Sequence, residues 1–162
     1  MDKSELDRLR GLVDLEYEPA THRVTRLDIL KFCYAIRETR AVHIDPVAAK
    51  RAGHPDLLAP TSFFASLGFS RGSIVERERL GSDGLPLEGS VDGTRVVAGE
   101  THVRFFGTIH AGDSITVQQR LLDVHSKSGT SGLMIFFVYE RTYTRPSGEL
   151  VVEERYSRIA RQ

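Results

Sequence analysis

The chain has 162 residues, a length typical of one domain built around a single apolar core. Lys plus Arg and Asp plus Glu balance at 22 each, so the overall charge does not indicate nucleic acid or an acidic membrane as a partner. The single Cys excludes an internal disulfide and suits a reducing compartment. No apolar run is long enough to predict a transmembrane helix, and the charged start MDKSELDRLR is unlike a signal peptide. We therefore expect one cytoplasmic globular domain over residues 1–162.

The first segments are predicted to be mostly helical. Residues 4–11 are polar enough for a short exposed helix, and residues 12–17 are expected to form a short strand. Thr25 is a favourable N-cap, and Asp28 three residues later completes a capping box, so a helix should begin there. Its apolar face would carry Ile29, Phe32, Cys33 and Ile36. This spacing favours Cys33 as a buried apolar residue over Cys33 as a nucleophile.

A second helix start lies at Asp45-Pro46. Asp is a good N-cap, and Pro suits the first helical position because its missing N–H has no partner there in any helix. We expect a short helix over about 46–52 that ends at Gly53, followed by an apolar loop over 57–60.

A longer helix is predicted from Thr61. Its apolar positions are Phe63, Phe64, Leu67 and Ile74. Gly68 and Gly72 are four residues apart, which leaves one side of this helix bare and indicates close backbone approach by whatever packs there.

The C-terminal half is predicted to be a sheet. Residues 81–93 are rich in Gly, Ser and Asp and suit a loop. Four long β-type segments then follow, at 95–109, 114–125, 132–145 and 149–160. Turn residues separate them, which predicts an antiparallel meander. Residues 132–139 are apolar on both faces, so we expect the helix to cover one face and a partner subunit the other. The fold class is α+β, with a long central helix wrapped by an antiparallel sheet.

Three stretches carry a resemblance to a known family. His43-Ile44-Asp45 with Ala49 and Gly53 matches the pattern H-x-D-x3-A-x3-G. Residues 58–63, LAPTSF, are close to I-A-P-P-T-F. Residues 109–123 and 148–151 lie where the family has an R-A-G-D turn and its last hairpin. In order and spacing the chain resembles, over nearly its whole length, the MaoC-like hydratase/dehydratase group. It is most similar to the FAS1-type dehydratase domain that forms the N-terminal half of double hot dog hydratases.

The resemblance implies a hot dog fold and an acyl thioester substrate. Water would be added to, or removed from, the double bond of an enoyl-coenzyme A or enoyl-carrier protein. The family's active pattern is D-x-N-P-x-H, which corresponds here to the window from Glu38 to His43. The His is retained, whereas Glu38 replaces the Asp, Arg40 the Asn and Ala41 the Pro. The resemblance therefore implies His43 and Glu38 as the catalytic pair.

The expected chemistry needs groups that move protons and donors for the thioester oxygen. A His moves protons well near neutral pH, and a nearby carboxylate can share the attacking water. Backbone N–H groups at a helix start can stabilise the oxygen, and because Pro60 lacks one, Thr61 or Ser62 would supply it. The remaining substrate-binding candidates are Ala59, Pro60, His54 and Arg40. Neither a metal nor a cofactor is expected beyond the coenzyme A or phosphopantetheine of the substrate.

Simpler interpretations of these residues stay open. His43 could be a polar loop residue, Asp45 a plain N-cap, and Glu38 a helix-end charge paired with Arg37 or Arg40. Four other histidines lie in β or turn contexts and are predicted at the surface: His22, His102, His110 and His125. Three arginines are weak candidates for the phosphates of coenzyme A: Arg71, Arg77 and Arg104.

Three other functions compete with the hydratase. The first is a non-catalytic acyl-binding subunit of a heteromeric dehydratase, which the altered window from Glu38 to Ala41 favours. The second is a thioesterase on the same fold. The third is a metal-dependent oxygenase, because His43-x-Asp45 has the spacing of a facial triad, although Pro46 directly after it opens a helix. We expect a homodimer, or a heterodimer with a second hot dog subunit, and no membrane or nucleic acid partner.

Overall fold

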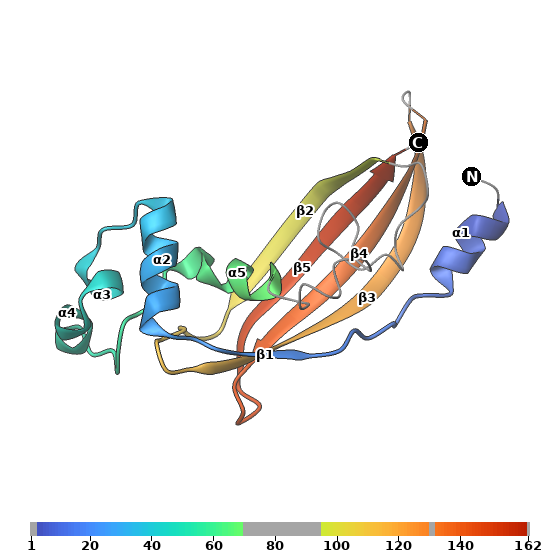
Figure 1. Ribbon diagram of the computed structural model, residues 1–162. Helices are drawn as coiled ribbons and strands as arrows, with labels where there is room; N and C mark the ends of the chain where they lie inside the picture. The colour runs from blue at the N-terminus through green and yellow to red at the C-terminus, as the bar shows by residue number, and fades with distance from the viewer. Residues whose placement is uncertain (1–2, 70–94, 130–131, 162) are drawn as a thin grey trace.

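The structure is a computed structural model that describes residues 3–69, 95–129 and 132–161 (Figure 1). Its helices are α1 (Lys3–Arg10), α2 (Arg26–Ile36), α3 (Ala41–Ile44), α4 (Pro46–Arg51), the 3₁₀ turn η1 (Thr61–Phe63) and α5 (Phe64–Phe69). Its strands are β1 (Ala20–Arg23), β2 (Arg95–Phe105), β3 (Ser114–Gly129), β4 (Gly132–Thr144) and β5 (Leu150–Arg161). The predicted α+β class is confirmed.

The strands form an antiparallel sheet in the order β1-β3-β4-β5-β2. The predicted meander is right for β3, β4 and β5 but wrong for β2, which pairs with β5 rather than with β3. At the end of β2 the amides of Phe106 and Gly107 still bond the carbonyl of Val151. The chain then leaves the sheet, and residues 109–111 pair with residues 57–59 instead. The strand therefore ends before the predicted limit at 109.

The helix starts follow the predicted local rules. Thr25 accepts from the amide of Asp28, and the Asp28 carboxylate bonds back to the Thr25 backbone, as in a full capping box. Asp45 caps α4, with Pro46 at the first position, and the turn after the helix contains Gly53 with φ +89°. That left-handed conformation is one that Gly adopts without steric cost.

Helix α1 and the segment after it differ from the prediction. Helix α1 is not simply exposed, because Leu9 is fully buried against the sheet residues Leu121, Tyr139 and Tyr156. Residues 12–17 form no strand, since Asp14 has φ 67° and breaks the extended run. The segment still follows β3, where the amide of Tyr17 bonds the carbonyl of Gln119.

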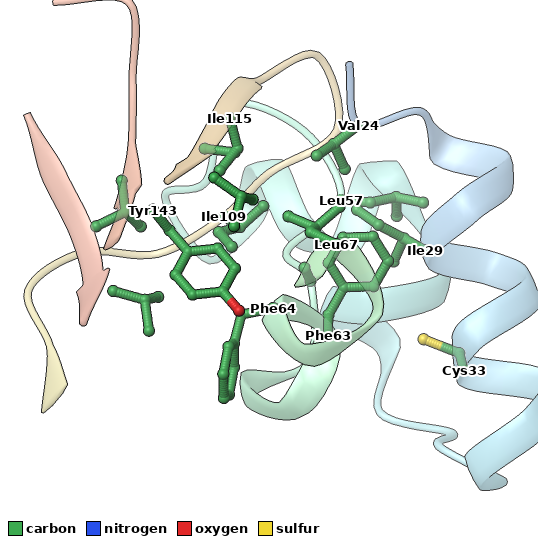
Figure 2. Close-up of a cluster of buried hydrophobic side chains, with 14 residues drawn as sticks. Val24, Ile29, Cys33, Leu57, Phe63, Phe64, Leu67, Ile109, Ile115 and Tyr143 are labelled. Carbon is green, nitrogen blue, oxygen red and sulfur yellow. The ribbon is translucent and has the colours of Figure 1, made fainter. Parts of the chain in front are cut away.

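The apolar core that supports the site lies between α2, α5 and the end of the sheet that carries Ile115, Tyr143 and Val151. Figure 2 shows Phe63 beside Leu57 and Ile29, while Phe64 faces Tyr143. The Phe64 and Tyr143 rings meet edge to face with centroids 5.5 Å apart. Cys33 is buried in this cluster, as predicted for a core residue. Ile36 is 47% exposed, contrary to its predicted place on the buried face, because α2 ends there in the left-handed cap of Arg37.

The predicted central helix is described from Thr61 to Phe69, with Phe63, Phe64 and Leu67 buried as expected. The rest of its prediction, including Gly72 and Ile74, lies outside the described residues, as does the predicted loop over 81–93. In β4 the side chains of Ile135 and Phe137 are buried, whereas Phe136 and Val138 on the other face stay partly exposed within one chain. In the part of the chain that is described, no helix is long and apolar enough to cross a membrane.

Candidate functional site

A cavity of ≈ 240 Å³ lies where the chain around α3, the start of η1 and the end of β2 meet. Five residues singled out from the sequence line it: Arg40, His43, Ala59, Pro60 and Thr61. Three others, Glu38, Ser62 and His54, are not among its lining residues. Most of the remaining wall is apolar and comes from Val42, Leu58, Phe105, Ile109 and Val152. The β2 and β5 contributions could not be found from motifs, because they depend on the pairing of these two distant strands.

His43 is buried at the wall of this cavity, with 3% of the residue exposed. Its Nδ1 lies 2.7 Å from the carbonyl oxygen of Leu58. A carbonyl oxygen only accepts, so Nδ1 carries the hydrogen and Nε2 holds the lone pair of the neutral ring. Nε2 is buried and has no hydrogen-bond partner among the described residues. The ring is thus fixed in the tautomer that presents a basic nitrogen.

Two further hydrogen bonds hold the backbone that carries this imidazole. The carbonyl of His43 accepts from the Cys33 thiol on α2 at 3.8 Å. The amide of Leu58 donates to the carbonyl of Val42 at 3.1 Å. The residues 42–43 and Leu58 are therefore joined by two hydrogen bonds, one through backbone and one through the His43 ring.

Glu38 is held by Arg40. Its carboxylate accepts from the Arg40 guanidinium at 2.7 Å and 3.1 Å and from the Arg40 amide at 2.9 Å. The hydrogen bonds from the Arg40 guanidinium are the main reason that the pKa of Glu38 falls to about 2. The carboxylate is therefore ionised throughout the neutral range. The ion pair with Arg40, one of the two arginine partners anticipated from the sequence, is present, and both carboxylate oxygens accept from the Arg40 guanidinium.

The start of η1 supplies the candidate oxyanion donor. Pro60 is the N-cap residue and makes no side-chain cap, and Thr61 follows at the cavity wall. The first amides of a helix have no partner within it, so the N–H of Thr61 is suited to a ligand oxygen. Ser62, the other candidate, is exposed and lies off the cavity.

Asp45 acts as the N-cap that the sequence predicted. Its carboxylate accepts from the amide of Val47 at 2.8 Å, and the residue is exposed. Within residues 3–69, 95–129 and 132–161, no group of three or more His, Cys, Asp or Glu side chains is placed to hold a metal ion. The spacing His43-x-Asp45 thus serves a helix start in this fold.

His110 is buried, with 8% exposed, so its predicted surface position is wrong. The reason is tertiary: His110 pairs with Leu58 in an isolated β-bridge, and its Nε2 lies 3.1 Å from Nδ1 of His54. His54 is half-buried beside it rather than at the cavity wall.

Of the three arginines considered for phosphates, Arg104 forms an ion pair with Glu153, and the other two lie outside the described residues.

Comparison with known proteins adds a family and a fold. The model of the family described as "FAS1-like, dehydratase domain region" matches residues 12–154. A UPF0336 protein of Saccharopolyspora erythraea is 30% identical over 154 residues, which cover 94% of this chain and 90% of that protein.

Two solved structures share the architecture. One is the C-terminally truncated HadBC (3R-hydroxyacyl-ACP dehydratase) complex of Mycobacterium tuberculosis, with a TM-score of 0.70 and 20% identity over 91% of this chain and 96% of the other. The other is the MaoC-like dehydratase of Rhodospirillum rubrum, with a TM-score of 0.65 and 18% identity over 93% and 92% of the two chains. The predicted hot dog fold is confirmed by these likenesses.

Proposed function

The chain belongs to the family of the FAS1-like dehydratase domain region, and from that premise we propose that it hydrates enoyl thioesters and dehydrates the corresponding 3-hydroxyacyl thioesters. The observation that carries the proposal is the His43 imidazole. It is buried at a largely apolar cavity, fixed in one tautomer by the Leu58 carbonyl, and its Nε2 is unpartnered among the described residues.

In hydration, Nε2 of His43 takes a proton from water as the water oxygen adds to the β-carbon of the enoyl group. Electrons of the double bond move toward the thioester, and the charge on its oxygen is stabilised by the Thr61 N–H. The imidazolium then gives its proton to the α-carbon, so that one water has been added and the ring is neutral again. Dehydration is the reverse sequence.

Glu38 has an electrostatic part in this scheme. With a pKa of about 2, its carboxylate cannot act as a proton donor near neutral pH. Its negative charge favours the imidazolium that forms at His43 during the reaction. Arg40 lies at the cavity wall with 69% of its side chain exposed, where it holds Glu38 and is accessible to the polar part of the substrate.

The acyl chain would lie against the apolar wall formed by Val42, Leu58, Phe105, Ile109 and Val152. We also propose a dimer of two such chains, or a heterodimer with a second hot dog subunit. The half-exposed face of β4, with Met134, Phe136 and Val138, supports this, and so does the two-chain HadBC complex among the structures with this fold.

The test is an absorbance assay of the purified chain alone with crotonyl-coenzyme A and with longer and branched enoyl thioesters. We expect saturable loss of the enoyl absorbance that His43→Ala abolishes. Release of free coenzyme A without hydration would contradict the proposal and indicate thioesterase activity instead.

A non-catalytic acyl-binding subunit is the second candidate, and the engagement of Glu38 by Arg40 favours it. It would be supported if the chain turned over nothing by itself and hydration appeared only after a second hot dog chain was added, with His43→Ala making no difference to the mixture.

A further inference from the structure

A second pair of titratable side chains lies behind the wall of the cavity. Nδ1 of His54 and Nε2 of His110 are 3.1 Å apart, and the two rings are inclined by 41° with centroids 5.2 Å apart. At this distance the two nitrogens share one hydrogen, which one ring donates and the other accepts. A hydrogen on both nitrogens would place two N–H groups head to head. The pair therefore holds together in its neutral or singly protonated state and separates when doubly protonated.

The pair is joined to His43 through one residue, Leu58. Leu58 and His110 face each other in an antiparallel bridge, in which the amide of Ala59 bonds the carbonyl of Ile109 and the amide of Ala111 bonds the carbonyl of Leu57. In such a bridge the N–H and C=O of Leu58 itself point to the opposite side. There they bond the Val42 carbonyl and Nδ1 of His43.

We propose that the His54–His110 pair positions His43, by locking the segment whose Leu58 carbonyl holds the His43 ring, and that protonation of the pair releases this lock. The inference rests on the proposed function for its effect on rate, but the link between the pair and the His43 ring stands on geometry alone. His54 and His110 are positioning residues in this scheme, because neither lies at the cavity wall.

The charges around the pair come from several segments. Oδ2 of Asp113 accepts from the His110 amide and lies 3.9 Å from its Nδ1, and Arg145 holds that carboxylate at 3.3 Å. Asp56, which forms an ion pair with Arg26, also raises the pKa of His110 through its negative charge.

Burial is the main cause that lowers the pKa of His110, and the negative charge of Asp113 acts in the opposite direction. A His with a lowered folded pKa stabilises the fold above its unfolded value, about 6.5, and that contribution is lost as the pH falls through the folded pKa. The lock is therefore complete at neutral pH and opens on the acid side.

A metal held by the two rings is a weaker explanation of the pair. The described parts of the chain offer no third His, Cys, Asp or Glu that would complete a site around them. A shared hydrogen bond also accounts for the 3.1 Å separation without any further ligand.

The experiment is a pH titration of the full-length chain with 15N-labelled imidazoles, in which the ring shifts of His43 report its tautomer. Wild type and three variants are compared. His54→Ala removes the pair, His54→Asn keeps a hydrogen-bonding nitrogen but does not titrate, and the exposed His102→Asn is the control, since His102 contacts Glu100 away from the site.

In wild type we expect His43 to stay in the Nδ1–H tautomer at neutral pH and to lose it in an acid transition that His110 shares. His54→Ala should average the two tautomers at neutral pH, His54→Asn should keep the tautomer and shift the acid transition, and His102→Asn should match wild type. If the enzyme is active, kcat of His54→Ala should fall about tenfold to a hundredfold with KM little changed, as expected for a misplaced catalytic group.

Identical His43 shifts in wild type, His54→Ala and His54→Asn over the whole pH range would overturn the proposal. The ring shifts are read without substrate. Failure of the lock therefore shows in the spectra, whereas failure of the proposed function shows as absence of turnover with the spectral link intact. Should His54→Ala fail to fold, the comparison of wild type with His54→Asn decides, because an unshifted acid transition at His43 contradicts the link.

Discussion

His43→Asn separates the chemical role of His43 from its structural one. The Asn amide nitrogen takes roughly the position of Nδ1 and can still donate to the Leu58 carbonyl, which accepts from His43 at 2.7 Å. The variant has no counterpart of Nε2, the nitrogen that is unpartnered among the described residues. The hydrogen bond between residues 43 and 58 is thus retained while the base is lost.

The expected loss follows from that geometry. Removal of a positioned acid–base group lowers the rate about a hundredfold to ten-thousandfold. At 1.36 kcal/mol for each factor of ten, this corresponds to about 2.7–5.4 kcal/mol of transition-state stabilisation. Because the Leu58 bond remains, the midpoint of urea unfolding should stay near that of wild type. His43→Ala should lose a similar factor in rate and also stability, since it leaves the half-buried Leu58 carbonyl without its hydrogen-bond donor.

The assay is kcat/KM for hydration of crotonyl-coenzyme A, followed by enoyl absorbance, with the unfolding midpoint measured on the same preparations. A His43→Asn variant within tenfold of wild type would refute the assignment of Nε2 as the base. If His43→Asn lost both kcat/KM and stability to urea, the imidazole ring would be mainly structural.

The remaining predictions concern Glu38, the buried network of the sheet, and association. Glu38→Gln removes a negative charge near the imidazolium but no proton-transfer group, so it should lower turnover by less than the factor of about a hundred or more expected for His43→Ala, and the double variant should be little worse than His43→Ala alone, because groups that act as a unit are not additive; near-normal turnover of Glu38→Gln would leave Glu38 as a helix-end charge. Arg141 is 3% exposed and bonds Gln119, Glu154 and Tyr156, so Arg141→Met should cost about 3–5 kcal/mol in urea unfolding. The matched control Arg120→Met, from the partly exposed pair with Glu140, should cost less than about 1 kcal/mol, and equal losses would contradict the buried network. Sedimentation should show a dimer at micromolar concentration, and a folded monomer would count against the association.

Local rules were sufficient for the helix starts that frame the site. The Thr25 capping box and the Asp45-Pro46 start each depend on residues within a few positions of one another, and both are present. The Glu38–Arg40 ion pair was also within reach, because the two residues are only two positions apart in the sequence. Such features depend on neighbouring residues in the sequence and not on tertiary contacts.

The features that the sequence did not predict depend on distant contacts. The pairing of β2 with β5 decides which residues line the far wall of the cavity, and β-type patterns do not specify a partner strand. The burial of His110 arises from its bridge to Leu58, and that of Leu9 from packing on the sheet. His110 lies in a turn and Leu9 in a short polar helix, and the local sequence of neither indicates the tertiary contact that buries it.

The engagement of Glu38 by Arg40 places a definite constraint on any mechanism at this site. In the proposed scheme one group must accept a proton from water and one must supply a proton to the α-carbon, and a carboxyl group with a pKa of about 2 is not protonated near neutral pH. Both transfers therefore fall to His43, with the proton that leaves water returning to carbon through the same nitrogen. This is geometrically reasonable only if the ring does not move between the two steps, so the two bonds that join residues 42–43 to Leu58 become part of the chemistry. The substitution of the family's Asp by Glu38 is then tolerable, because the carboxylate needs only to keep its charge near the imidazolium and does not need to reach the substrate.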